Sequence, residues 1–301
     1  MRKVENELPL LTIFTPAYNR AHTLTRTYDS LKKQNRFDFI WLIIDDGSTD
    51  NTASLVQGWK QEKNGFQIEY IYKENGGMHT AHNVAYENIQ TELNVCIDSD
   101  DILALNAIDK IYSIWGKITD KNCAGIVGLD ADMSGKIIGN EFESEGMKTT
   151  LSGFYQRGGK GDKKLVYRTD IMKRYPPYPV FGDEKLVPLS YKYILCDQDY
   201  YLVATNTVLC NVEYQDDGST NNMWKQRVRN AEGFAFYKKI CMQYPYSRKG
   251  LIKNTIMYIA FNRLGKAKGY LKNSPERVLT ILLFPCGWVF EKIIRKKSHL
   301  F

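Results

Sequence analysis

The sequence has no hydrophobic run long enough to cross a bilayer. Its longest apolar stretch, residues 278–290, is interrupted by Pro285 and Gly287 and is shorter than the roughly 20 residues that a spanning helix needs. The chain also does not open with the basic, apolar and small-residue pattern of a secretory signal. We therefore expect a cytoplasmic protein that neither spans a membrane nor is secreted.

Cysteine is scarce, and two common cofactor motifs are missing. The six cysteines are scattered, with no Cys-x-x-Cys pair and no metal-ligand spacing, so we expect reduced, buried thiols. No Gly-x-Gly-x-x-Gly follows the first apolar run, which argues against a dinucleotide-dependent dehydrogenase. The absence of Gly-x-x-x-x-Gly-Lys-Ser/Thr excludes P-loop chemistry.

Charge is unevenly distributed along the chain. The 301 residues carry 41 Lys and Arg against 34 Asp and Glu, a net charge of +7. Residues 225–301 hold 17 of the basic residues and 3 of the acidic ones, an excess of 14, which leaves 24 basic and 31 acidic residues in the first 224. Clustered positive charge favours a polyanion or an anionic membrane as partner.

Over the first 130 residues, short apolar runs alternate with helix-like segments. This alternation is typical of βαβ units and a mostly parallel sheet. We expect the first strand to stop at Pro16, and a helix to be capped by Ser48, Thr49 or Asp50. The other expected strands and helices are strands at 10–14, 39–44, 68–72, 95–97 and 124–129, and helices at 24–31, 79–89 and 104–115.

After residue 130 the local signals are weaker. Residues 153–164 indicate a Gly- and Lys-rich loop, and the proline-rich stretch 175–179 cannot lie inside a helix. Apolar runs within 200–214 favour further strands, and the sequence from about Met223 is helical and basic. We therefore expect an α/β domain over residues 1–222 and a basic helical region over 223–301.

Four polar clusters follow four of the expected strands, at residues 16–20, 45–48, 73–77 and 98–101. Ligands of open parallel sheets bind beyond the carboxyl ends of the strands. Any one cluster could be an ordinary polar turn, but four in register favour one shared site. Gly47 and Ser48 could serve only the turn and the helix cap.

The cluster Asp98-Ser-Asp-Asp101 is the most informative of the four. Three carboxylates so close together repel one another unless a cation or strong donors compensate them. Mg²⁺ typically takes one or two carboxylates together with substrate phosphates, so the cluster predicts a divalent cation beside a diphosphate. The alternative is an N-cap cluster for the helix that begins near Ala104.

The sequence contains four motifs: Thr-Pro-Ala-Tyr-Asn-Arg at 15–20, Ile-Ile-Asp-Asp-Gly-Ser-Thr-Asp at 43–50, Glu-Asn-Gly-Gly-Met-His-Thr-Ala-His-Asn at 74–83 and Asp-Ser-Asp-Asp at 98–101. Together these motifs resemble glycosyltransferase family 2. The resemblance covers roughly residues 8–105. It implies an inverting nucleotide-sugar transferase of the GT-A fold: an α/β, Rossmann-like, mostly parallel sheet flanked by helices, here with a C-terminal helical segment.

The resemblance also assigns roles to residues. It implies that the nucleobase is held by Pro16, Ala17, Tyr18 and Asp46, and that Lys73, Gly76 and Gly77 line the nucleoside. Asp98 and Asp100 would bind the sugar-diphosphate and Mn²⁺ or Mg²⁺, with Asp100 the better metal ligand. Further candidates for nucleotide-sugar binding are Arg20, His79, Asn83 and Ser99. His79 and His82 could contact phosphate or metal, or could be structural.

The family also needs a base to deprotonate the acceptor hydroxyl. The segment Phe-Gly-Asp-Glu-Lys at 181–185 resembles its later acidic motif, and we expect Glu184 to be the base, with Asp183 as the second choice. The alternative is an exposed carboxylate at a helix start. Asp216-Asp-Gly-Ser219 resembles a short motif of bacterial polysaccharide-assembly members that shapes the acceptor side, or is a plain turn.

Processive members of the family carry Gln-x-x-Arg-Trp and membrane spans, whereas Gln226-Arg-Val-Arg229 is followed here by Asn230. We therefore expect transfer of a single sugar from a UDP-sugar, with inversion, to a glycan or lipid-linked oligosaccharide of a capsule, exopolysaccharide or lipopolysaccharide pathway. The alternatives are a sugar nucleotidyltransferase and a non-catalytic component of an assembly complex. The sequence leaves the sugar, the acceptor and the oligomeric state open.

The basic C-terminal region lies beside the apolar stretch 278–290 and ends in Arg295-Lys-Lys297. This combination favours peripheral docking on the anionic inner face of the cell membrane, where a lipid-borne acceptor would be found. Nothing in the acidic first part of the chain supports nucleic acid as the partner. A solvated basic helical bundle is the alternative.

Overall fold

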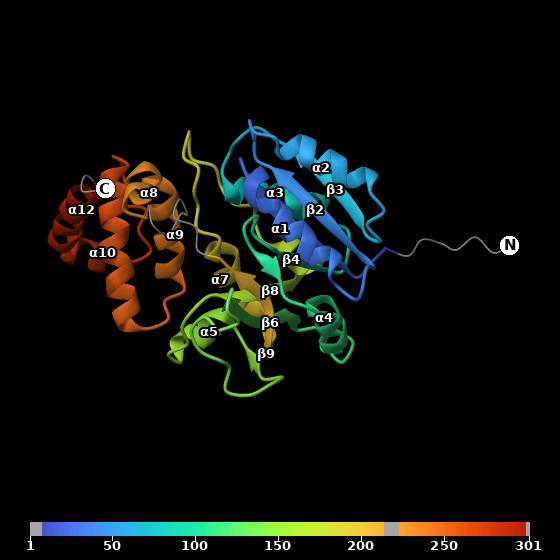
Figure 1. The fold of residues 1–301 in the computed structure, drawn as a ribbon. Coiled ribbons are helices and arrows are strands. Elements are labelled where there is room, and N and C mark those ends of the chain that lie inside the picture. Colours follow the sequence, from blue (N-terminus) through green and yellow to red (C-terminus); the bar gives the residue numbers. More distant parts are fainter. Residues whose placement is uncertain (1–7, 214–222, 299–301) are drawn as a thin grey trace. The chain divides into compact units, whose positions relative to one another are not determined.

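A computed structural model describes residues 8–213 and 223–298, so the motif Asp216–Ser219 lies outside the described residues. The chain divides into two compact units, each described here by itself. The sheet unit comprises the described residues of Met1–Asn75, Ala81–Pro176 and Cys196–Glu213. The helical unit comprises Gly76–Thr80, Pro177–Leu195 and the described residues of Tyr214–Phe301 (Figure 1).

The first half of the sheet unit is parallel, as the sequence predicts. Its strands lie in the order β3-β2-β1-β4, and each neighbouring pair is parallel. Helices alternate with these strands along the chain, which confirms the βαβ pattern. The elements are β1 (Leu11–Ala17), α1 (Ala21–Lys32), β2 (Phe39–Asp45), α2 (Thr52–Gln61), β3 (Gln67–Tyr72), α3 (Met78–Asn88) and β4 (Leu93–Cys96).

The second half makes the sheet mixed. Beyond β4 the strand order continues β8-β6-β9-β5, β8 is antiparallel to both of its neighbours, and β7 pairs with β9. The predicted α/β fold class is confirmed. The elements are β5 (Ile102–Leu103), α4 (Ala107–Trp115), β6 (Cys123–Asp132), β7 (Lys148–Thr149), α5 (Leu151–Gln156), β8 (Lys163–Arg168), α6 (Thr169–Arg174), α7 (Ser190–Asp199) and β9 (Tyr201–Val212).

Three local predictions are wrong. The N-cap residue of α2 is Asn51, and not Ser48, Thr49 or Asp50. The segment 153–164 is not a loop throughout, because α5 includes its start and β8 begins at Lys163. The first strand does not stop at Pro16, which pairs with Ile44 of β2. Pro16 lacks an N–H, but that position of β1 faces β4, whose pairing with β1 ends at Phe14, so no ladder hydrogen bond is lost.

Aromatic rings fill the space between the sheet and the helices that cover it. Tyr28 of α1 stacks on Trp59 of α2 with ring centroids 4.3 Å apart, and on Trp41 of β2 at 5.9 Å. The Trp41 indole N–H donates to Thr15 Oγ1 at 3.0 Å, so the buried indole keeps a polar partner. This packing holds α1 and α2 against β1 and β2.

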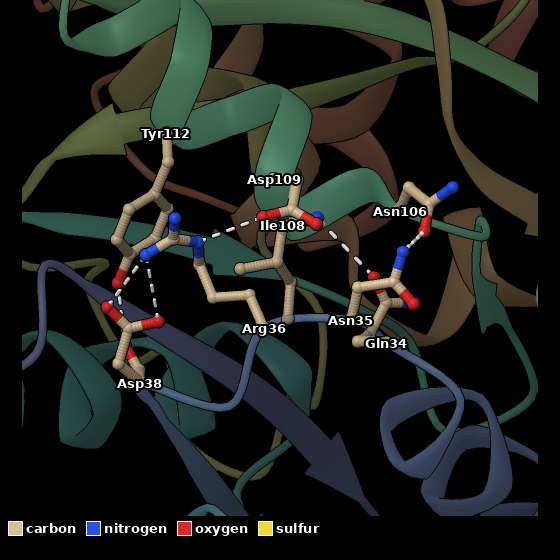
Figure 2. Close-up of polar contacts among 8 residues, drawn as sticks. All are labelled: Gln34, Asn35, Arg36, Asp38, Asn106, Ile108, Asp109 and Tyr112. Carbon is tan, nitrogen blue, oxygen red and sulfur yellow. Dashed lines mark hydrogen bonds and ion pairs between the residues drawn. The ribbon is translucent and has the colours of Figure 1, made fainter.

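A polar clamp fixes α4, the helix that follows the acidic turn after β4 (Figure 2). Arg36 donates to Asp109 at 3.0 Å and to Asp38 at 3.1 Å, and its guanidinium lies 4.4 Å from the centre of the Tyr112 ring. The Tyr112 hydroxyl donates to the Asp38 carbonyl at 2.6 Å. The loop before β2 therefore holds α4, and with it the segment leading from β4.

The helical unit contains the predicted C-terminal helices, which Figure 1 shows in orange and red. They are α8 (Met223–Arg229), α9 (Ala231–Gln243), α10 (Arg248–Leu264), α11 (Arg277–Leu282) and α12 (Phe284–Ser298). Phe234 of α9 stacks on Phe261 of α10, and Ile294 of α12 is fully buried in the same cluster. Among the described residues, no helix has the length and apolar character to cross a membrane.

One buried carboxylate joins two helices of this unit. Glu291 of α12 is 4% exposed and accepts from Arg263 of α10 at 2.7 Å and from Arg295 at 2.8 Å. Burial acts to raise the pKa of Glu291, but the hydrogen bonds from Arg295 and Arg263 outweigh it and hold the pKa below its usual value. The ionised form is therefore more stable in the folded chain than in the unfolded one.

We expect Glu291→Gln to lower the free energy of unfolding at neutral pH by about 2 kcal/mol. The loss is smaller than for a fully buried pair because Arg295 stays partly hydrated. Urea unfolding of the full chain measures it, with the exposed Glu276→Gln as the control. Because the folded pKa is depressed, the difference should be present above the unfolded carboxyl pKa and vanish as the pH falls through the folded value. A difference that persists unchanged into strong acid would contradict this assignment.

Candidate functional site

The loops that follow β1 and β2 are bonded to each other. The amide of Asp46 donates to the Ala17 carbonyl at 2.8 Å. The amide of Asn19 donates to Ser48 Oγ at 2.9 Å, and the Thr49 amide donates back to Asn19 Oδ1 at 2.8 Å. Asn19 takes a left-handed conformation, with φ 53°, which asparagine tolerates better than most residues. The Ser48 side chain thus has a structural role, because it joins the loop after β2 to the loop after β1.

The loop after β3 joins the other two at Asp46. The buried Asp46 carboxylate accepts from Lys73 Nζ at 2.5 Å, and the Asn75 side chain donates to the Asp46 carbonyl at 2.9 Å. Gly47 has φ +85°, and a Cβ there would lie 2.7 Å from the Asn75 nitrogen, so this crossing requires glycine. Two of the four sequence clusters and the first residues of a third, Lys73 to Asn75, therefore meet in the sheet unit.

The remaining candidates on these loops differ in exposure. Tyr18 is 48% exposed, so its ring presents a face to solvent. Ala17 is buried at the end of β1, and Arg20 is half-buried, with its amide donating to Thr52 Oγ1 at 3.2 Å. Asn75 was not among the residues expected from the sequence to bind the nucleotide-sugar, although it directly precedes Gly76 and Gly77.

The acidic turn after β4 lies beside the end of β1, because the Ile97 amide donates to the Phe14 carbonyl at 3.0 Å. Asp98 and Asp100 are half-buried there, and Ser99 is buried. The alternative of an N-cap cluster is wrong, since the N-cap residue of α4 is Asn106. Burial raises the pKa of Asp100, and the nearby Asp98 carboxylate raises it further.

The third carboxylate of the turn is compensated by a lysine that the sequence reasoning missed. Asp101 is buried, and its Oδ2 lies 3.5 Å from Nζ of Lys164, itself buried on β8. Burial lowers the pKa of the Lys164 ammonium, but Cys210 and the carboxylates Asp130, Asp101 and Asp98 outweigh this, so its pKa is raised. The turn thus divides into one paired carboxylate, Asp101, and two half-buried ones, Asp98 and Asp100.

Asp98 and Asp100 suit a divalent cation in charge and donor type. Burial and the neighbouring Asp98 carboxylate both raise the pKa of Asp100, and a cation beside the two carboxylates would relieve their repulsion. Among the described residues, no group of three or more His, Cys, Asp or Glu side chains is arranged to hold a metal. These two carboxylates could therefore supply only part of a coordination sphere, with the rest left to substrate oxygens and water, as is usual for Mg²⁺.

Gly76, Gly77 and His79 belong to the helical unit. Gly77 has φ +90°, and a Cβ there would lie 1.9 Å from the carbonyl oxygen of Lys185. The glycine motif therefore packs backbone to backbone against the acidic motif at 183–185, which no local sequence signal indicates. His79 is buried at 1% exposure.

Two further candidates lie on the part of α3 that belongs to the sheet unit. Asn83 is half-buried. His82 is fully buried, with its ring 4.9 Å from that of Phe14 and its Nε2 3.6 Å from Cys96 Sγ. The surroundings of His82 are those of a core side chain, in line with the structural alternative.

Within the acidic motif, Glu184 and Asp183 differ in their surroundings. Both carboxylate oxygens of Glu184 accept hydrogen bonds at 2.8 Å, from the amides of Glu232 and Gly233 in the first turn of α9. Burial raises the pKa of Glu184, against the two backbone bonds, which lower it. Asp183 is exposed. The structure therefore gives Glu184, which is half-buried, an anchoring contact at the start of α9.

A residue downstream also holds this motif. The Lys185 amide donates to Asn230 Oδ1 at 2.7 Å, while Asn230 Nδ2 donates to the Gln226 carbonyl at 3.0 Å. Asn230 stands where processive family members have the tryptophan of Gln-x-x-Arg-Trp. In this chain the position supports the backbone that follows Asp183 and Glu184.

Sequence comparison matches up to about half of the chain to known proteins. Relatives include the hyaluronan synthase of Pasteurella multocida, 30% identical over 151 residues, which are 48% of this chain and 15% of that protein. An uncharacterized glycosyltransferase of Rickettsia typhi is 31% identical over 122 residues, 40% of this chain and 37% of that protein. The chain thus covers far less than two thirds of these relatives.

Solved structures match over nearly the whole chain. Staphylococcus aureus TarS 1–349 in complex with UDP-GlcNAc matches with a TM-score of 0.61 at 16% identity, covering 96% of this chain and 92% of that one. The mannosyltransferase PcManGT of Pyrobaculum calidifontis, in complex with GDP-Man and Mn²⁺, matches with a TM-score of 0.56 at 16% identity, covering 98% and 84%. These similarities establish the GT-A type of fold.

The sequence model of glycosyl transferase family 2 matches residues 12–172, a range that contains the three bonded loops, the acidic turn and Lys164. Because this match extends over more than half of the chain, and because the fold is of the GT-A type, the chain belongs to glycosyl transferase family 2.

Proposed function

We propose that this chain is an inverting, metal-dependent glycosyltransferase that moves one sugar from a UDP-sugar to a glycan acceptor. The observation that carries the proposal is the junction at Asp46, where the loops after β1, β2 and β3 are bonded beside the strand that leads to Asp98 and Asp100. The site lies at the carboxyl ends of parallel strands, where α/β sheets bind their ligands.

In the proposed donor site the nucleobase lies against Pro16, Ala17 and Tyr18, with the exposed Tyr18 ring available for stacking. Asp46 accepts a hydrogen bond from the base, and its ion pair with Lys73 sets the carboxylate in place before the ligand binds. The other proposed donor contacts are Arg20, Gly76, Gly77, His79, Asn83 and Ser99. TarS structures in complex with UDP-GlcNAc and with UDP support a uridine nucleotide.

We propose Asp98 and Asp100 as the residues that hold Mn²⁺ or Mg²⁺, with Asp100 the main ligand. The cation would neutralise the charge that develops on the departing diphosphate. The PcManGT complex with Mn²⁺ supports a divalent cation in this fold. Lys164 supplies the counter-charge for Asp101, so that carboxylate stays an internal partner.

We propose Asp183 as the base, in place of the Glu184 expected from the sequence. In the proposed step the acceptor hydroxyl gives its proton to the Asp183 carboxylate, and its oxygen forms a bond to the anomeric carbon from the face opposite the diphosphate. The bond from that carbon to the diphosphate breaks, and UDP leaves with the electron pair. Glu184 would have to release two backbone amides to act, so it positions the motif.

The acceptor and the setting extend the same proposal. We propose a lipid-linked oligosaccharide of a capsule, exopolysaccharide or lipopolysaccharide pathway as acceptor, and single-sugar addition, since Asn230 replaces the tryptophan of processive members. Residues 1–222 would form the catalytic domain, and the basic region 223–301 would hold the chain on the inner face of the cell membrane. Release of UDP rather than pyrophosphate distinguishes this activity from a nucleotidyltransferase.

Asp46→Asn should weaken UDP binding by about tenfold or more, because a hydrogen bond to a charged partner contributes roughly 1.5–3 kcal/mol. Calorimetry with Mn²⁺ present measures the affinity. Asp29→Asn on α1, also in the sheet unit and exposed, is the matched control and should bind UDP like the wild type. Equal affinities for all three proteins would rule out the proposed nucleobase contact.

The choice of base is tested by two isosteric variants. Asp183→Asn should lower transfer by on the order of 10²–10⁴-fold, the usual contribution of a general base, and leave UDP affinity unchanged. Glu184→Gln should lower stability by about 1 kcal/mol, as for a lost helix cap, and retain most of the rate per folded molecule. The reverse order of activities would reinstate Glu184 as the base.

Metal removal provides the third test. Chelation by EDTA, or the substitution Asp100→Ala, should lower release of UDP from UDP-sugars by about 100-fold or more, since a bound cation contributes several kcal/mol to a developing anion. Calorimetry gives a second readout, because Mn²⁺ should strengthen UDP binding to the wild type and not to Asp100→Ala. Asp29→Ala is the control. Metal-independent UDP release would refute the proposed role of Asp98 and Asp100.

A further inference from the structure

Two helices of the helical unit leave large apolar side chains in water. On α11, Val278, Ile281 and Leu282 are 73%, 63% and 70% exposed. On α12, which contacts α11, the exposed apolar side chains are Trp288, Val289 and Ile293. We call these six residues the apolar ridge. Single exposed apolar residues are common on soluble proteins, but a contiguous group indicates an interaction surface.

The exposed side of α12 carries both apolar side chains and lysines. At 3.6 residues per turn, Trp288, Val289 and Ile293 lie on the same side of the helix as Lys292 and Lys296, all of them exposed. The opposite side carries the buried residues Gly287, Glu291 and Ile294. Lys292 Nζ lies 5.7 Å from the centre of the Trp288 ring. Apolar and cationic side chains therefore share one outward surface.

A groove between α10 and α12 has the same character. It has a volume of about 340 Å³ and is lined by Ile252, Ile256, Met257 and Phe290, with Lys249 and Lys253 among its lining residues. Lysine stems cover apolar surface while their ammonium groups reach outward. Apolar surface accompanied by lysines is thus found on both α10 and α12.

This composition favours an anionic membrane over a protein partner. Lysine is depleted at protein–protein interfaces, and two copies of a region with 17 basic and 3 acidic residues would repel each other. One of those acidic residues, Glu291, is buried and paired with Arg263 and Arg295. Aromatic and aliphatic side chains interleaved with lysine are typical of helices that lie in the headgroup region.

We propose that the apolar ridge inserts into the headgroup–acyl boundary of an anionic phospholipid membrane, with Lys292 and Lys296 against the lipid phosphates. The axis of α12 lies in the plane of the membrane. This inference rests on the proposed membrane location and names the surface responsible for it. It does not depend on the transfer chemistry, so the two proposals can fail separately.

The full chain is tested by co-sedimentation with phosphatidylcholine vesicles that contain or lack phosphatidylglycerol. We expect binding only with phosphatidylglycerol, weakening as salt is raised. The triple variant Val278→Ser/Ile281→Ser/Leu282→Ser should weaken vesicle binding by on the order of tenfold or more, because its three apolar side chains are no longer available to be buried in the membrane. Lys292→Gln/Lys296→Gln should weaken it by roughly fivefold for each lysine removed.

Matched controls make the result specific to this surface. Leu105→Ser removes an apolar side chain that is also 70% exposed, and Lys117→Gln/Lys121→Gln removes two exposed lysines of the sheet unit; both variants should bind vesicles like the wild type. Circular dichroism and UDP affinity should be unchanged in all variants, which separates lost docking from misfolding or a failed donor site. Binding that ignores lipid charge, that persists in the ridge variants, or that falls equally in the controls would overturn the proposal.

If the apolar ridge were instead the contact surface for a second copy of the chain, the experiments would give a different result. In that case the wild type would dimerise without lipid, and the ridge variants would be monomeric by light scattering. That outcome would also overturn the membrane proposal. Truncation is a poorer test than these substitutions, since removing α12 would remove the buried Ile294 and the Glu291 ion pairs.

Discussion

Three aspartates at the end of β2 and in the loop after it, Asp45, Asp46 and Asp50, join the carboxyl ends of the parallel strands. Asp45 is fully buried and accepts from the Ser48 amide at 2.7 Å and from the Tyr70 hydroxyl of β3 at 2.5 Å. Asp46 binds Lys73 and Asn75 of the loop after β3. Asp50 accepts from the Ala21 amide at the start of α1 at 3.1 Å. A charged acceptor forms stronger hydrogen bonds than a neutral one, so a single segment fixes the ends of three parallel strands.

Charge compensation explains why the acidic turn after β4 divides its carboxylates. A buried carboxylate needs a cation or several donors, whereas a partly hydrated one does not. Asp101 is buried and lies 3.5 Å from Lys164, while Asp98 and Asp100 are half-buried and repel each other. The lysine compensates the innermost acid from within the fold. It thereby leaves the other two as the place where an external cation would relieve repulsion.

The parallel half of the sheet could be predicted from the sequence, and the partners of its acidic residues could not. Short apolar runs with helical segments between them determine βαβ units locally, and the strand order then brings their ends together. Lys164 looked like part of a surface loop, because its burial depends on Asp101 and Asp130, which are distant in sequence. The partners of Glu184 could not be predicted for the same reason, since the α9 amides that it accepts from come 48 and 49 residues later. The periodicity of apolar residues indicates which side chains are buried in the core. It carries no information about which charged side chains pair with one another in the folded chain.

The two units differ in how their charged side chains are paired. In the sheet unit several acidic side chains are paired within the fold. They accept hydrogen bonds from backbone amides and from Tyr70, or form ion pairs with Lys73 and Lys164. In the described part of the helical unit, Glu291 forms ion pairs with both Arg263 and Arg295. Lys292 and Lys296 of α12 are exposed and lie on the same side of the helix as apolar side chains whose exposure costs free energy in water. A phospholipid membrane is anionic at its surface and apolar beneath. It would therefore compensate both the positive charge and the apolar exposure of this surface, in line with the proposed docking.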